Sequence, residues 1–192
     1  MARLVLTAPL PRVHGVAEDL RGEGHEVLEL PFAAIEALTG EPAQRAVLAE
    51  LSNFDLVVFV SPTAIDVFVE ALEQGWPEGL RPAVVGPGSL EALGAHGLDT
   101  AAGLLMPPGP VFDAAGLLAD PALAAPCAMR VLVVRAEGGN QRIEETLSAR
   151  GAQVTALAAY RRRPLGVRAE ARAKLAQWLG QELFVVVTTE GP

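Results

Sequence analysis

Residues 54–64 read FDLVVFVSPTA, and this stretch decides the fold class. Leu56 to Val60 form a continuous apolar run without polar alternation, which is typical of a parallel strand that is covered on both faces. Ser61-Pro62 follow at once, and a hydroxyl residue before a proline favours a helix start. The next apolar residues share one helical face, at i, i+3, i+4 and i+7: Ile65, Phe68, Val69 and Leu72. A strand that leads directly into a helix predicts an α/β protein.

The same pattern recurs along the chain. Further short runs rich in Val, Leu and Phe end at turn or helix-start residues: Leu4 to Thr7, Ala83 to Val85, Val131 to Val134 and Phe184 to Val187. Glycines stand where the intervening helices should end: Gly24, Gly75, Gly97 and Gly151. We therefore expect parallel sheets with helices on both faces.

The two halves of the chain also match each other. Leu4 and Val131 are 127 positions apart, and the same spacing relates Gly24 to Gly151 without a gap. With one inserted residue, Ser61 matches Thr189. Duplication of a strand–helix–strand unit is one explanation, and chance likeness between two such units is the other.

The second copy stops at Pro192, where its next helix should begin. On the duplication hypothesis we expect about 60 residues of a complete two-copy protein to be absent. A truncated chain, a natural fragment and a part of something longer all stay open at this point.

Composition narrows the class of protein. The 192 residues are 51% hydrophobic and carry 15 Lys+Arg against 23 Asp+Glu, a formal charge of −8. This excludes a disordered chain and disfavours nucleic-acid binding. No apolar run approaches the length of a membrane span or a signal peptide, and a single cysteine, Cys127, fits a reducing compartment. We expect a cytoplasmic protein with neither nucleic acid nor membrane as a partner.

Hydroxyl residues at the strand ends are the first candidates for ligand contacts. In α/β folds, ligands bind beyond the carboxyl ends of the strands, where helix N-termini offer N–H groups to anions. The candidates at these junctions are Thr7, Ser61, Ser89 and Thr189. The alternative is that each one only caps its own helix.

Nucleotide and metal sites find little support. The segment from Gly86 to Glu91 resembles a dinucleotide fingerprint, but Glu91 stands where the third glycine is needed. The histidines are scattered, which favours surface positions for His14, His25 and His96. We expect no cofactor and no metal.

Residues 160–164 read YRRRP and are predicted to follow a strand and precede a helix. The arginines are interpreted either as a solvated linker or as a local positive patch that holds carboxylates.

In these motifs the chain resembles uroporphyrinogen-III synthase over nearly all of its length. The opening LVLTAP is similar to the family's "vTRP" strand end, with Ala8 in place of the usual arginine. Further similar segments, in the family's order, are residues 54–64, Val84-Val85-Gly86 with Ser89, Gly116-Leu117-Leu118, Val131 to Gly139, Gly151-Ala152 and Tyr160-Arg161-Arg162.

The resemblance implies two flavodoxin- or Rossmann-like parallel-sheet domains joined by a two-stranded linker. The first domain would be discontinuous and here incomplete, built from residues 1–31 and 164–192, with residues 32–163 as the inserted domain. The crossing strands would lie near Glu29 to Ile35 and Thr155 to Arg162.

The resemblance also implies a cofactor-free lyase (EC 4.2.1.75) of heme and other tetrapyrrole biosynthesis. Hydroxymethylbilane would lose water and close to uroporphyrinogen III with inversion of ring D. Tyr160 matches the family tyrosine suggested as general acid, with a structural ring as the alternative. The residues that carry over as substrate contacts are Thr7, Ser61, Gly86, Ser89, Arg135 and Thr189.

Partners and rival functions complete the expectations. The resemblance implies a linear tetrapyrrole as ligand, hydroxymethylbilane synthase as an upstream partner, and a monomer. The rivals are a non-catalytic two-lobed α/β module that binds another small ligand, and an inactive fragment of the synthase.

Overall fold

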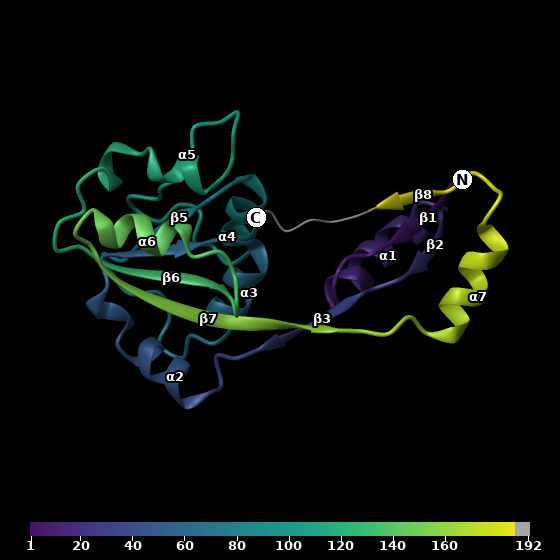
Figure 1. Cartoon of the computed structure of the whole chain (residues 1–192), viewed down its shortest axis with the longest axis horizontal. Coiled ribbons are helices and arrows are strands. Elements are labelled where there is room, and N and C mark those ends of the chain that lie inside the picture. The colour runs from purple at the N-terminus through teal and green to yellow at the C-terminus, as the bar shows by residue number, and fades with distance from the viewer. Residues whose placement is uncertain (187–192) are drawn as a thin grey trace. The chain divides into compact units, whose positions relative to one another are not determined.

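The computed structural model describes residues 1–186 (Figure 1). The backbone divides into two compact units. Unit 1 comprises residues 1–36 and the described residues from 162 onward, and unit 2 comprises residues 37–161. The chain passes between the units within strands β3 (Ala33–Ala37) and β7 (Gln153–Pro164).

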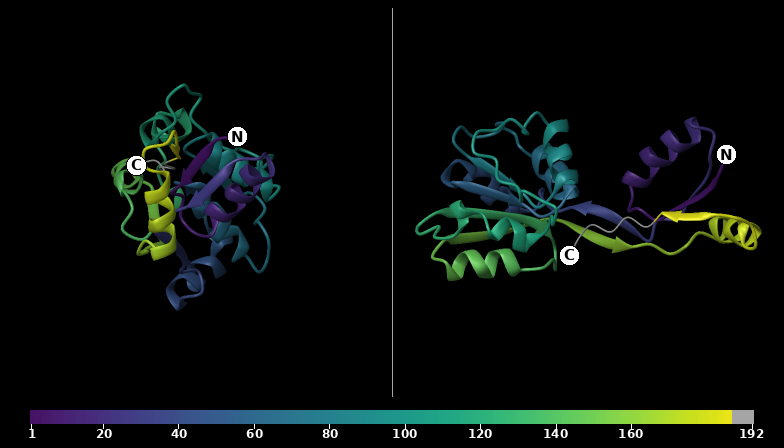
Figure 2. Two further views of the ribbon diagram at one scale, coloured as in Figure 1. Left: turned by 90° about the vertical axis from the view of Figure 1, so that its right-hand side faces the viewer. Right: turned by 90° about the horizontal axis from the view of Figure 1, so that it is seen from above.

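Unit 1 is built on a parallel three-stranded sheet of order β2-β1-β8, formed by β1 (Arg3–Leu6), β2 (Glu26–Glu29) and β8 (Phe184–Val186). Helix α1 (Arg12–Gly22) packs Val13 and Ala17 on the face that carries Leu6. Helix α7 (Ala169–Trp178) packs Trp178 on the opposite face, against Val5 and Leu28. The left view of Figure 2 shows these two helices on opposite sides of the sheet.

The second sheet has the order β3-β7-β6-β4-β5, and its strands β4 (Leu56–Phe59), β5 (Arg81–Val84) and β6 (Arg130–Ala136) lie in unit 2. One face is covered by α5 (Ala114–Leu118) and α6 (Arg142–Ala149), and the other by α3 (Pro62–Glu70) and α4 (Pro87–Ala95) (Figure 2, right). Phe59 meets Phe68 edge to face, with ring centroids 5.2 Å apart. The remaining elements are α2 (Pro42–Ala49), η1 (Leu51–Asn53) and η2 (Pro121–Leu123).

The prediction of an α/β protein with parallel sheets is confirmed. All four residues of β4 are buried, as its unbroken apolar sequence predicts. The same reasoning is wrong for β8, because Phe184 and Val185 are more than half exposed among the described residues. Gly24 and Gly151 have φ of +87° and +93°, which explains why glycine ends these helices.

The internal repeat extends to the strand registers. Arg3 pairs with Glu26 and Arg130 with Gln153, so the β1–β2 and β6–β7 ladders begin at equivalent positions. Leu4 pairs with Phe184 and Val131 with Leu56, which gives the β1–β8 and β6–β4 ladders one register as well. The order β2-β1-β8 is therefore repeated as β7-β6-β4.

Two sequence-based strand assignments need correction. The strand expected over Glu29 to Ile35 is divided into β2 and β3, because Pro31 has no N–H group for a ladder. The local pattern that places residues 160–163 after a strand is wrong, since they lie inside β7, where the resemblance implies the crossing strand Thr155 to Arg162. No helix within residues 1–186 has both the length and the apolar character that crossing a bilayer requires.

Candidate active site

Most of the predicted site residues lie near the carboxyl edge of the unit 2 sheet. Strand β4 leads through α3 to β5 on one side, and β6 leads through α6 to β7 on the other. The order of the strands reverses between β4 and β6, and ligands of open α/β sheets bind at such a switch point.

Ser61 follows β4 and is the N-cap of α3. Its backbone is extended, and its Oγ accepts a hydrogen bond from the Ala64 N–H at 3.2 Å. Pro62 occupies the first turn, where a missing N–H costs nothing. Ser61 is buried, so packing fixes the position of its hydroxyl at the carboxyl edge of the sheet.

Tyr160 lies against Ser61, although 99 positions separate them in sequence. The two hydroxyl oxygens are 3.1 Å apart, and either of them can be the donor. The tyrosine is 1% exposed. The structure therefore brings together two residues that were predicted separately, and it places both within unit 2.

A β-bulge sets the direction of Tyr160. The β6–β7 register shifts between Arg135 and Ala136, so that Arg135 lies opposite Ala158 while Ala136 lies opposite Tyr160. Ala159 is the extra residue. Because successive strand residues point to opposite faces, this shift changes the face on which Tyr160 lies.

Arg135 stands near the end of β6 and is already engaged. Its Nε donates to Glu144 Oε1 of α6 at 2.5 Å, and its Nη1 donates to the Ala136 carbonyl at 3.1 Å. Both side chains are only 12% exposed. Arg135 therefore joins the end of β6 to α6 through its Nε and Nη1 groups.

Gly86 and Ser89 lie at the next strand exit. Gly86 is the N-cap of α4, and a Cβ added there would lie 3.2 Å from Phe112 Cβ. Ser89 is the third residue of the helix and is buried. The capping interpretation is thus wrong for Ser89.

Thr7 belongs to unit 1, at the end of β1. Its Oγ1 donates to the Val186 carbonyl at 3.1 Å, while the N-cap of α1 is Pro11, so Thr7 does not cap that helix. Thr189, its expected companion, lies outside the described residues.

The three consecutive arginines do not form one patch. As members of β7, Arg161 and Arg163 lie on one side of the strand and Arg162 on the other. Arg161 Nη2 also pairs with Glu41 at 3.0 Å.

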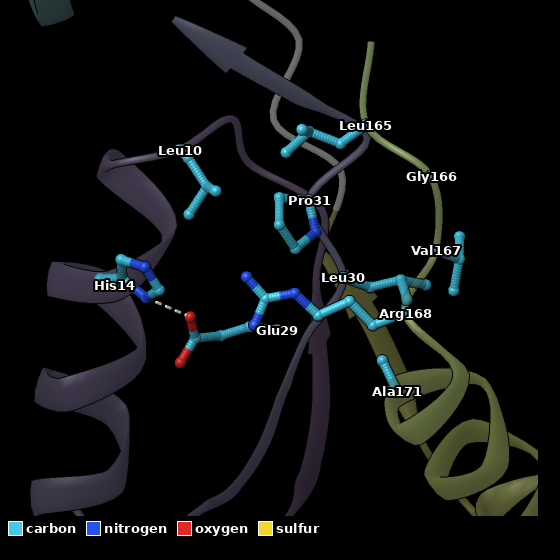
Figure 3. Close-up of a pocket in the computed structure, with 10 residues that line it drawn as sticks. All are labelled: Leu10, His14, Glu29, Leu30, Pro31, Leu165, Gly166, Val167, Arg168 and Ala171. Carbon is cyan, nitrogen blue, oxygen red and sulfur yellow. Dashed lines mark hydrogen bonds and ion pairs between the residues drawn. The ribbon is translucent and has the colours of Figure 1, made fainter.

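Sequence analysis missed a pocket in unit 1, which has a cavity volume of about 140 Å³ (Figure 3). Three of its lining residues have ionisable side chains: His14, Glu29 and Arg168. Glu29 accepts a hydrogen bond from His14 Nδ1 and pairs with Arg21 at 2.9 Å. The prediction that His14 lies at the surface is confirmed, since its side chain is 61% exposed, but no local motif relates it to Arg168. Within residues 1–186, no three His, Cys, Asp or Glu side chains gather as a metal site requires.

Comparisons with known proteins agree with this architecture. The family model for uroporphyrinogen-III synthase HemD matches residues 15–190. The uroporphyrinogen-III synthase of Escherichia coli is 28% identical over 98% of this chain and 75% of its own length. That of Salmonella typhimurium is 27% identical over the same shares.

Solved structures share the fold. A mutant uroporphyrinogen III synthase from Thermus thermophilus aligns with a TM-score of 0.60 and 20% identity, over 93% of this chain and 68% of the other. Uroporphyrinogen-III synthetase from Helicobacter pylori aligns with a TM-score of 0.54 and 12% identity, over 91% and 68%. The chain belongs to the uroporphyrinogen-III synthase family.

Proposed function

We propose that this protein converts hydroxymethylbilane into uroporphyrinogen III and water. Family membership supports the reaction, and the Ser61–Tyr160 hydroxyl pair at the switch point of unit 2 is the observation that carries the proposed site. We also propose that the enzyme is a cytoplasmic monomer that receives its substrate from hydroxymethylbilane synthase.

The reaction requires a proton for the leaving hydroxyl and a site that holds the flexible substrate during ring closure. The terminal hydroxyl of the substrate leaves as water once it is protonated, and the remaining azafulvene cation is attacked by the substituted carbon of ring D. The spiro intermediate then reopens and recloses with ring D inverted, and a proton is returned when the ring becomes aromatic. A strong nucleophile on the protein is not needed, because the substrate supplies both reacting carbons.

We assign the proton donor to Tyr160, with Ser61 as the relay. The Ser61 oxygen accepts one hydrogen bond from Ala64 N–H and can accept a second from the Tyr160 hydroxyl. In that arrangement the Ser61 proton is directed away from both partners, toward a ligand. Transfer from Ser61 to the departing hydroxyl is followed by reprotonation of Ser61 from Tyr160.

The other predicted contacts follow as part of the proposal. The buried Ser89 and the Gly86 turn lie at the neighbouring strand exit. Thr7, Arg135 and Thr189 are further substrate contacts in this proposal. We propose that residues 1–31 and 164–192 form one folding domain and residues 32–163 the other, which limited proteolysis of the native protein tests.

The experiment for the reaction supplies hydroxymethylbilane and separates the oxidised porphyrin isomers. We expect isomer III in excess over the isomer I that forms without an enzyme. Isomer I alone contradicts the proposed reaction. Saturable binding of an unrelated ligand with no change in the isomer ratio would favour the non-catalytic module instead.

The experiment for the relay uses Tyr160→Phe, Ser61→Ala and the double variant. Loss of a general acid lowers kcat by about 100-fold, so each single variant should show a loss of that order. Because the two groups act in one relay, the double variant should lose little more than either single variant. A Tyr160→Phe variant with unchanged kcat and a lower Tm would give Tyr160 a structural role and overturn the assignment.

A further inference from the structure

The pocket of unit 1 lies at the carboxyl edge of its sheet. Its walls come from the first turn of α1, from the chain after β2 and from the chain before α7 (Figure 3). All of its lining residues belong to unit 1, so the pocket is complete within that unit. Most of the wall is apolar: Leu10, Leu30, Pro31, Leu165, Val167 and Ala171.

Arg168 is the free cation of this pocket. The side chain extends from the start of α7 into the pocket, on the side of Glu29 (Figure 3). Within the part of the chain that the structure describes, its guanidinium makes no hydrogen bond or ion pair. An arginine directed into a pocket without a protein partner is suited to an anionic ligand.

Glu29 does not neutralise Arg168, because other groups hold its carboxylate. His14 Nδ1 bonds one oxygen and Arg21 Nη1 pairs with the other at 2.9 Å. The glutamate is 19% exposed, so it keeps this position with little competition from solvent. The three-residue arrangement leaves the donors of Arg168 available.

The size and polarity of the pocket define the ligand. A cavity of about 150 Å³ accommodates a ring the size of benzene, so about 140 Å³ suffices for a pyrrole ring or its acidic arm but not for a tetrapyrrole. Apolar walls suit the ring and methylene carbons. The adjacent Glu29 charge disfavours a dianion such as phosphate relative to a single carboxylate.

We propose that this pocket binds one carboxyalkyl pyrrole group, with Arg168 bonding the carboxylate and Glu29, fixed by His14 and Arg21, excluding a second negative charge. The proposal rests on the proposed function for the identity of the ligand. It assigns to unit 1 a specific subsite for one carboxyalkyl arm of a substrate ring.

The direct test measures binding of a pyrrole propionic acid by calorimetry and by the Arg side-chain NMR signals. Wild type is compared with Arg168→Met and with Arg172→Met, an exposed arginine one turn further along α7 that does not line the pocket. We expect the acid to bind wild type and Arg172→Met equally, and to bind Arg168→Met about tenfold more weakly, as a lost charged hydrogen bond requires. The amide of the same probe and inorganic phosphate should not compete. Equal binding by Arg168→Met, or competition by phosphate, overturns the proposal.

Steady-state kinetics distinguish a failure of the pocket proposal from a failure of the proposed function. With hydroxymethylbilane, Arg168→Met should raise KM about tenfold and leave kcat and Tm unchanged, since Arg168 has no partner in the described protein. If wild type forms isomer III and Arg168→Met matches Arg172→Met, the pocket proposal alone fails. If wild type forms only isomer I, the proposed function fails, and the binding experiment still decides whether the pocket takes a carboxyalkyl pyrrole.

Discussion

The two copies of the internal repeat share their strand registers but differ behind the carboxyl end of the central strand. In unit 2, Arg135 of β6 pairs with Glu144 of α6. The positions 127 residues earlier are Ala8 and Ala17, which are both buried in the unit 1 core. One copy thus joins strand and helix by a nearly buried ion pair, and the other by two small apolar side chains.

A second difference concerns the outer strand. In unit 1, Pro31 interrupts the chain between β2 and β3, and the interruption provides part of the wall of the pocket. In unit 2, Ala158 takes the equivalent position, and β7 continues through it with a bulge that directs Tyr160 to Ser61. The same backbone plan therefore gives a pocket in one copy and a hydroxyl pair in the other.

Removing one member of the Arg135–Glu144 ion pair should have the largest effect on the free energy of unfolding. Arg135→Ala leaves Glu144 in a site that is 12% exposed, and an unpaired carboxylate there should lower the free energy of unfolding by about 3 kcal/mol. The double variant Arg135→Ala, Glu144→Ala reproduces the unit 1 alanines and should be more stable than the single variant. Urea unfolding of a Trp178→Phe background, in which Trp76 is the remaining tryptophan of the chain, reports on unit 2.

The matched control is Glu26→Ala, followed through Trp178 in a Trp76→Phe background. Its ion pair with Arg3 is on the surface of unit 1, where such pairs contribute little. A double variant that is less stable than Arg135→Ala would show that the two copies are not interchangeable at this position.

The next largest effect on the free energy of unfolding is expected from the hydroxyl residues at the strand exits. Ser61 caps α3 through Ala64, whereas Thr7, also at a strand exit, bonds Val186 at the surface. Ser61→Ala should lower the free energy of unfolding of unit 2 by about 1 to 2 kcal/mol, because a cap and a buried hydroxyl partner are lost together. Thr7→Val is the control and should cost about 0.5 kcal/mol in unit 1. Equal losses from the two variants would contradict the difference seen between the two strand exits.

Local patterns predicted the elements that depend only on neighbours in sequence. The apolar run from Leu56 predicted β4, and the glycines at 24 and 151 predicted two helix ends. These features depend on neighbours in sequence, so they can be read without the fold. Residues 160–163 were placed after a strand because three arginines before a proline favour a solvated linker, whereas in the structure these residues belong to β7.

The contacts within the candidate sites could not be predicted from sequence, because they depend on the folded chain. Ser61 and Tyr160 were both predicted from their strand ends and the family resemblance, but their contact depends on a bulge that has no sequence signature of its own. The pocket joins the N-terminal helix to residues near 168, a distance in sequence that no motif spans. Arg135 was predicted as a substrate contact, yet the partner that occupies it becomes evident only when α6 is packed on the sheet.

The smallest expected effect tests whether equivalent positions of the two repeat copies contribute equally to the free energy of unfolding. Gly24 and Gly151 end equivalent helices with positive φ, and alanine at either position is strained by about 1 kcal/mol. A Cβ at Gly24 would meet nothing within 4 Å, and one at Gly151 would touch Cys127 Sγ at 3.6 Å, an ordinary contact. Gly24→Ala, followed by Trp178 in a Trp76→Phe background, and Gly151→Ala, followed by Trp76, should therefore lose the same free energy within about 0.5 kcal/mol. A clearly larger loss at Gly151 would mean that the contact with Cys127 is tighter than its distance indicates, and that the two helix ends are equivalent in backbone but not in packing.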